Sequence, residues 1–255
     1  MNRYLAPIIT IILVNILFYL IFFRKKPISF QNWMKLFLFP FLLVIVIPYH
    51  QVERILLNIW AGFLPVLSIN TFLVLIELIL LSVSMYFLIK ITPKRGIELF
   101  PYFLLIGLGL GCGRFFRNVI LVWYHPLNSF FGYGQFSNFI TGFYIVQEVL
   151  QLLIVIVCSG YMGLGFIRFM KGQFSKGIMS IIFSFLMLEI DALVRVLFQY
   201  VPFFAFFSAV YVISILPLLF ILGGLFLWMS YRRQEKKELE IKKENSKLVS
   251  GSSGS

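Results

Sequence analysis

Apolar residues gather in seven long stretches, and polar or turn-forming residues separate each stretch from the next. A helix needs about 20 apolar residues to cross the hydrocarbon layer of a membrane, and each stretch is long enough. The pattern therefore predicts an all-α fold, a polytopic membrane helix bundle with about seven transmembrane helices. Pro202 disfavours a continuous helix and separates the last two stretches. The predicted spans lie near residues 4–23, 32–50, 66–91, 100–124, 142–170, 176–199 and 204–230.

Lysine and arginine collect in alternate loops between these stretches. The first, third and fifth loops and the tail are basic, whereas the second loop carries only Arg54, opposed by Glu53. Loops rich in lysine and arginine stay on the cytoplasmic side of a membrane. The alternation therefore predicts an odd number of spans, with the N-terminus outside and the C-terminus cytoplasmic. The basic residues that set this orientation include Arg24, Lys25, Lys26, Lys35, Lys90, Lys94, Arg95, Arg168, Lys171, Lys176, Arg232, Arg233, Lys236 and Lys237.

The composition excludes a water-soluble domain. Hydrophobic residues make up 60% of the chain and charged residues 13%, against about 25% charged residues in soluble domains. The net charge of +12 is explained by basic cytoplasmic loops, so no nucleic-acid partner is predicted. Membrane lipids are the expected partners, and the expected location is the cell membrane, with multiple passes. Cys112 and Cys158 lie inside predicted spans, which favours small core residues over a disulfide or a metal site.

Three parts follow one another along the chain. Residues 1–230 form the predicted transmembrane domain, and Arg24 with two lysines follows its first stretch where a signal peptide would have a cleavage site. Residues 231–250 form a charged tail, interpreted as a cytoplasmic helix continuing the last span or as a solvated basic segment. Glu238 faces Lys242 one turn on, and a homodimer contact or a cytoplasmic signalling partner is expected here. Residues 251–255 are typical of an added linker, and the natural chain is expected to continue.

Seven ionisable residues lie inside predicted spans, where a charge is costly. Such residues face the bundle interior, pair with one another, and mark ligand, ion or proton sites. With a helical rise of about 1.5 Å per residue, all seven lie roughly 20–28 Å from the cytoplasmic ends of their spans, in the outer half of the membrane. These candidate ligand-binding residues are Glu77, Arg114, Arg117, Glu148, Glu189, Asp191 and Arg195.

Helical spacing indicates which of these charges meet. Arg114 and Arg117 share a face, and Asp191 and Arg195 can pair one turn apart. Glu189 points to nearly the opposite side of its helix and is expected to contact an arginine of the fourth span. The predicted result is a polar cavity bounded by spans three to six and open to the outside. Because arginine binds carboxylate and phosphate bidentately, a small anionic ligand is the hypothesis. Charges that only fix helix packing are the alternative.

Two further features are interpreted without a chemical role. Glycines alternate in the fourth span at positions 107, 109, 111 and 113, and in an apolar helix this favours close approach of another helix over phosphate binding. The outer segment 51–67 is expected to form a short interfacial helix. The outer segment 125–142 is expected to lie on the membrane surface or to cover the bundle mouth as a lid. His50, Glu53 and His125 lie near them, but no metal or other cofactor is predicted.

An outward-facing polar cavity and a charged helix leaving the last span favour a receptor or sensor that signals through its C-terminal helix. In topology, this arrangement resembles the seven-span N-terminal sensor modules of some bacterial histidine kinases. A transporter or channel component that uses the same intramembrane charges is one alternative. An intramembrane enzyme is another, with Glu148, Glu189 and Asp191 as acid and base groups, although the sequence favours a non-enzymatic role.

Overall fold

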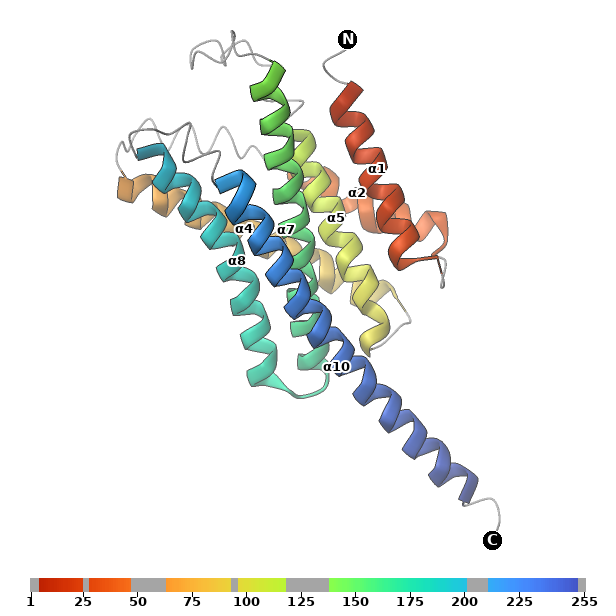
Figure 1. The fold of residues 1–255 in the computed structure, drawn as a ribbon. Helices are drawn as coiled ribbons and strands as arrows, with labels where there is room; N and C mark the ends of the chain where they lie inside the picture. Colours follow the sequence, from red (N-terminus) through yellow and green to blue (C-terminus); the bar gives the residue numbers. More distant parts are fainter. Residues whose placement is uncertain are drawn as a thin grey trace.

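The computed structural model describes residues 5–24, 28–46, 63–92, 96–117, 138–200 and 211–251, which form helices and no strand (Figure 1). The prediction of an all-helical chain is confirmed. The predicted outer segments lie largely outside the described residues, as do both histidines. The α-helices are α1 (Leu5–Phe22), α2 (Phe30–Val46), α4 (Phe63–Ile91), α5 (Phe100–Phe116), α7 (Asn138–Met170), α8 (Phe174–Tyr200) and α10 (Leu216–Gly251). Short helical turns precede α5 and α10, namely η1 (Gly96–Leu99) and η5 (Tyr211–Ile215).

Four segments of the described chain are long and apolar enough to cross a membrane. They lie at 67–90, 96–116, 145–170 and 213–241, and α1 and α2 contribute shorter apolar segments at 8–22 and 30–46. α8 occupies the sixth predicted span but is not one of the four. Length and composition are therefore compatible with a membrane bundle, while the number of spans and their orientation remain predictions.

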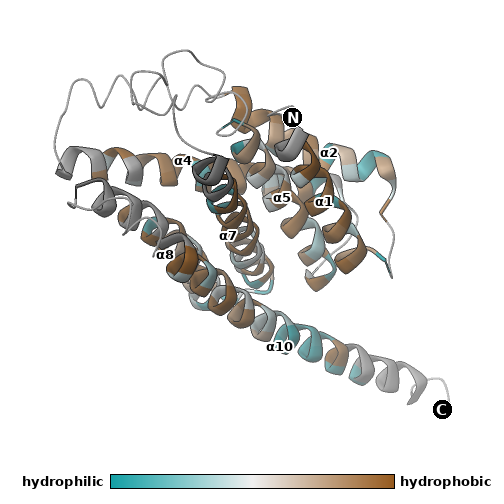
Figure 2. Cartoon of the chain, turned by 45° about the horizontal axis from the view of Figure 1, so that its top comes forward, coloured by the Kyte–Doolittle hydropathy of each residue, from teal (hydrophilic) through white to brown (hydrophobic). Residues whose placement is uncertain are grey.

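α5 lies at the centre of the bundle, and α10 lies on its outside. Buried residues make up 89% of the most apolar window of segment 96–116 but 17% of that in segment 213–241. Cys112 and Cys158 are fully buried, as predicted for small core residues. The exposed side chains of α10 include Leu218, Leu225 and Phe226, an apolar surface that suits lipid better than water. Figure 2 shows hydrophilic residues replacing apolar ones where α10 leaves the bundle.

The alternating glycines of α5 allow two helices to approach it from different sides. A Cβ atom at Gly107 would lie 2.4 Å from Cβ of Ser159 in α7, and one at Gly109 would lie 2.3 Å from the backbone oxygen of Phe37 in α2. Positions 111 and 113 repeat this alternation one turn later. The hydroxyl of Ser159 also donates a hydrogen bond to the carbonyl of Phe103, at 2.5 Å. The predicted role of these glycines in close helix packing is confirmed.

α4 runs across the other helices instead of alongside them (Figure 1). Thr71 near its start contacts α8, and Glu77 in its middle contacts α5. The ring of Phe87 near its end packs edge-on against Phe39 of α2, with 5.8 Å between ring centroids. A depth calculated from helical rise assumes helices that stand side by side. That assumption fails for α4, so its residues cannot be ranked by depth from the sequence.

α10 continues unbroken through two residues that often interrupt helices in membranes. Pro217 is its second residue, and α10 directly follows the π-helical turn η5, so the missing N–H group of the proline lies at the junction between the two helix types. Gly223 lies two turns further on, and its carbonyl accepts a hydrogen bond from the buried hydroxyl of Tyr161 in α7, at 2.9 Å. This contact attaches α10 to α7 within the apolar part of the bundle.

We expect Tyr161→Phe to lower the free energy of unfolding by about 1 kcal/mol, because the change removes one hydrogen bond and preserves the ring. Denaturant unfolding of the full chain in a mild detergent, followed by circular dichroism, measures the effect. Tyr86→Phe is the matched control, since that side chain is 52% exposed, and we expect no measurable change from it. Equal losses in the two variants would contradict a specific role for the Tyr161 hydroxyl.

Candidate functional site

Arg114 and Glu77 form a buried ion pair between α5 and α4. Nη1 of Arg114 lies 3.1 Å from Oε2 of Glu77, and the two side chains are 8% and 7% exposed. Each of these buried charges depends on its partner, because an uncompensated charge in a protein interior is strongly destabilising. The structure thus brings two of the predicted site residues into direct contact.

The packing of α5 against α7 brings further charges to the same level. The two helices run in opposite directions (Figure 1), with Gly111 of α5 beside Leu152 of α7. One further turn of each helix brings Arg114 level with Glu148, and Arg117 lies less than a turn beyond Arg114. Arg117 and Glu148 are both buried, at 8% and 5% exposure. Buried charged groups from α4, α5 and α7 therefore gather at one end of the bundle.

Gln151 adds a neutral polar group to this end. It lies three residues after Glu148 and therefore on the same face of α7. Its side chain is 2% exposed, and neither its amide oxygen nor its amide nitrogen has a hydrogen-bond partner in the described part of the chain. A buried polar group without a partner costs about 1–3 kcal/mol. The Gln151 amide is therefore suited to hydrogen bonding with a small polar molecule.

Glu189 of α8 has a different partner from the expected one. Its Oε1 accepts a hydrogen bond from the hydroxyl of Thr71 in α4, at 2.5 Å, and its buried Oε2 has no hydrogen-bond partner among the described residues. The contact predicted between Glu189 and an arginine of the fourth span is not formed. Spacing fixes the face that a residue occupies on its own helix, but it does not identify the neighbouring helix. Thr71 was missed because a single threonine in an apolar span gives no signal.

The last two predicted site residues, Asp191 and Arg195, lie near the C-terminal end of α8. The hydroxyl of Ser184 donates to the carbonyl of Cys158 at 3.0 Å, which sets the antiparallel register of α8 against α7. Seven residues further along α8, position 191 is level with Gln151. The side chains of Asp191 and Arg195 lie outside the described residues, so their pairing remains a prediction.

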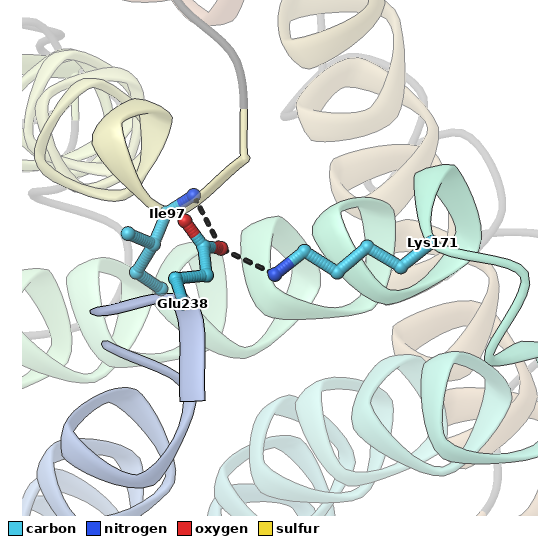
Figure 3. A network of polar contacts seen from close by, with 3 residues as sticks. All are labelled: Ile97, Lys171 and Glu238. Carbon is cyan, nitrogen blue, oxygen red and sulfur yellow. Dashed lines mark hydrogen bonds and ion pairs between the residues drawn. The ribbon is translucent and has the colours of Figure 1, made fainter. Parts of the chain in front are cut away.

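A polar contact at the opposite end of the bundle ties α10 to two other segments (Figure 3). Oε1 of Glu238 accepts a hydrogen bond from the backbone N–H of Ile97 in η1, at 3.0 Å, and forms an ion pair with Lys171 beside the α7–α8 turn. The carboxylate lies against Gly96, whose φ of +62° favours glycine. We call Ile97, Lys171 and Glu238 the clamp. Four-residue spacing indicated only Lys242 as a partner for Glu238, and the side chain of Lys242 lies outside the described residues.

Two described pockets lie away from the gathered charges. One, of about 460 Å³, is lined mainly by apolar side chains of α2, α4 and α5, including Leu38, Phe39 and Leu88. The other, also about 460 Å³, lies near the clamp and is lined by basic side chains of α7, α8 and α10. The cavity expected between the third and sixth spans therefore remains a prediction. No group of three His, Cys, Asp or Glu side chains gathers in the described part of the chain.

The bundle therefore has two polar ends joined by α7. One end holds the buried charges around Arg114, and the other holds the clamp and the basic pocket. α7 carries Glu148 and Gln151 in its first half, and Lys171 follows directly after its last residue. The chain matches no family model, no curated protein and no solved structure, so its function is inferred from these two ends and the helix between them.

Proposed function

We propose that the chain is a membrane receptor or sensor that binds a small anionic ligand at its charged end and signals through α10. The binding groups, called the charged cluster below, come from α4, α5 and α7, and α8 borders them. The charged cluster comprises Glu77, Arg114, Arg117, Glu148 and Gln151.

The amide of Gln151, which has no hydrogen-bond partner among the described residues, is the observation that carries this proposal. Structural polar groups in a protein interior are normally hydrogen-bonded within the protein or to ordered water. An amide at 2% exposure with no protein hydrogen-bond partner among the described residues supports a site that a bound molecule completes. Arg114 and Arg117 lie within about a turn of its level, and guanidinium groups favour carboxylate or phosphate. The favoured ligand is therefore a small carboxylate or phosphate compound.

α7 supports the signalling part of the proposal, because it contacts α10 repeatedly after leaving the charged cluster. A Cβ atom at Gly160 would lie 2.5 Å from the side chain of Leu227, so the two helices nearly touch there. Tyr161 holds the carbonyl of Gly223 one turn earlier in α10. Glu238 joins the charged part of α10 to Lys171 in the clamp. A shift of α7 on ligand binding would therefore move α10, which continues as one helix to Gly251.

The orientation in this proposal places the clamp in the cytoplasm and the charged cluster toward the outside. The segment after α4, the α7–α8 turn and the charged part of α10 are three of the four predicted basic cytoplasmic segments. The clamp joins parts of all three segments. Segments that contact one another lie on the same side of the membrane, which agrees with their basic character.

Distance measurement between spin labels on α8 and α10 tests the proposal. Ser175→Cys and Glu244→Cys provide exposed label positions, while the native Cys112 and Cys158 are fully buried. The probes are inorganic phosphate, acetate, succinate and citrate, each added to the full chain in lipid nanodiscs. We expect at least one of these anions to shift the label distance. Gln151→Leu should raise the concentration needed about tenfold, because it removes the amide that the anion contacts.

Gln31→Leu is the matched control, since it removes an exposed glutamine at the start of α2. It should respond to the anion as the parent chain does. If no probe anion shifts the distance, or if Gln151→Leu and Gln31→Leu respond alike, the proposed link between the charged cluster and α10 is wrong.

A further inference from the structure

The pocket near the clamp is strongly cationic. It has a volume of about 460 Å³ and lies where the end of α7, the start of α8 and the middle of α10 meet. Five basic side chains line it against one acidic side chain. They are Arg168, Lys176, Arg233, Lys236 and Lys237, with Glu240 as the acid.

Two acidic residues near the pocket are paired with other residues, which leaves Glu240 as the acid that lines it. Glu235 pairs with Arg232 at 3.1 Å, and Glu238 pairs with Lys171 in the clamp. Among the described residues, none of the five cations that line the pocket forms an ion pair with a carboxylate. Such a concentration of like charge repels itself unless an anion is bound among the charges.

Arg168 gives the pocket a fixed inner wall. Its Nη1 donates to the carbonyl of Lys176 at 3.2 Å and also to the hydroxyl of Ser180, which holds the guanidinium between α7 and α8. A guanidinium group has five N–H donors, so one nitrogen can serve the protein while others serve a ligand. Gln234, at 8% exposure, adds an amide to the α10 wall of the pocket.

The pocket lies where the apolar surface of α10 ends. Trp228 and Met229 are exposed, the pocket begins at Ser230, and charged residues follow from Arg232 onward. The guanidinium of Arg232 lies 4.9 Å from the ring centroid of Trp228. Tryptophan next to basic residues is typical of the headgroup region of a membrane. A lipid phosphate would lie at this depth.

We propose that this pocket binds a phosphate anion, and that an acidic phospholipid headgroup supplies it. Several basic side chains around one small volume match the charge and the multiple acceptor oxygens of a phosphate group. A bound headgroup would bridge α8 and α10 beside the clamp. This site is separate from the charged cluster and does not depend on the ligand proposed there.

Native mass spectrometry of the full chain from a neutral detergent tests this site. Dioleoyl phosphatidylglycerol and dioleoyl phosphatidylcholine are added separately, and the fraction of protein carrying lipid gives the affinity for each. We expect the chain to bind phosphatidylglycerol at least tenfold more tightly. Arg233→Gln with Lys237→Gln should weaken that binding about thirtyfold, since each basic residue near an anionic lipid contributes roughly fivefold. Arg233→Lys with Lys237→Arg should preserve it.

The matched control is Arg24→Gln with Lys90→Gln, which removes the same charge from exposed residues outside the pocket. It should retain the preference for phosphatidylglycerol. Competition with glycerol 3-phosphate and inorganic phosphate identifies the source of the anion. If millimolar glycerol 3-phosphate or inorganic phosphate displaces the lipid, the site is one for free phosphate compounds. If the lipid stays bound, the phospholipid headgroup is the source of the phosphate.

Two results would overturn the proposal. One is equal affinity for the two lipids, and the other is an equal loss in the pocket variant and the control. If the double variant does not fold, the exposed single variant Lys237→Gln replaces it, with an expected loss of about fivefold.

Discussion

Glu77→Leu is expected to lower the free energy of unfolding by about 3–5 kcal/mol, because it removes the carboxylate that lies 3.1 Å from the buried guanidinium of Arg114. The pair is 3.1 Å apart and less than a tenth exposed, so water cannot replace the lost charge. Arg114→Met in the same chain should recover a large part of this loss, since apolar residues of similar size often replace a buried ion pair without penalty. Denaturation of the full chain in detergent measures the free energy of unfolding of the parent chain, of Glu77→Leu and of the double variant.

The exposed ion pair between Arg232 and Glu235 provides the control for this double-mutant cycle. Its side chains are 61% and 31% exposed, so Glu235→Leu should cost at most about 1 kcal/mol. If Glu77→Leu and Glu235→Leu have the same effect, the Arg114–Glu77 pair does not hold α4 to α5. If Arg114→Met fails to recover stability, Arg114 acts mainly through contacts other than that with Glu77.

The helices of this chain could be predicted from the sequence because each one corresponds to a run of consecutive apolar residues. α1, α7 and α8 begin and end within a few residues of the predicted spans. α10 extends well beyond its predicted apolar stretch, because the charged residues after Ser230 are also good helix formers. The close packing of other helices against α5 could likewise be predicted from its alternating glycines, since only small residues permit helices to approach so closely.

The partners of the charged residues were harder to predict, because they depend on how helices cross. Arg114 and Arg117 share a face as their spacing requires, yet spacing did not indicate that Arg114 meets Glu77. The crossing path of α4 places Thr71 beside Glu189 and Glu77 beside Arg114. Lys171 and Glu238 are 67 residues apart, and no local pattern connects them. The sequence therefore indicated which groups are chemically important, but not which of them meet.

The close packing of α5 leads to the second large expected effect. Gly109→Ala is expected to lower the free energy of unfolding by about 3 kcal/mol, at the upper end of the usual cost of overpacking. The new Cβ atom would lie 2.3 Å from the backbone oxygen of Phe37 and 2.9 Å from Pro40, and backbone cannot move aside as a flexible side chain can. α2 and α5 would have to separate along their whole contact. Denaturation of the full chain in detergent measures the loss.

A graded series of glycine variants separates this clash from the general effect of replacing glycine in a helix. Alanine is favoured over glycine in helices by about 1 kcal/mol, so Gly224→Ala, with no atom within 4 Å of the new Cβ, should leave stability unchanged or raise it. Gly111→Ala should be intermediate, because its nearest contacts, the side chain of Leu152 at 3.1 Å and the backbone oxygen of Leu152 at 3.2 Å, are less close than the backbone contact at Gly109. The order Gly224, Gly111, Gly109 follows the space available at each position. If Gly109→Ala proved as harmless as Gly224→Ala, α2 could not lie against α5 at this distance, and the central position of α5 between α2 and α7 would be wrong.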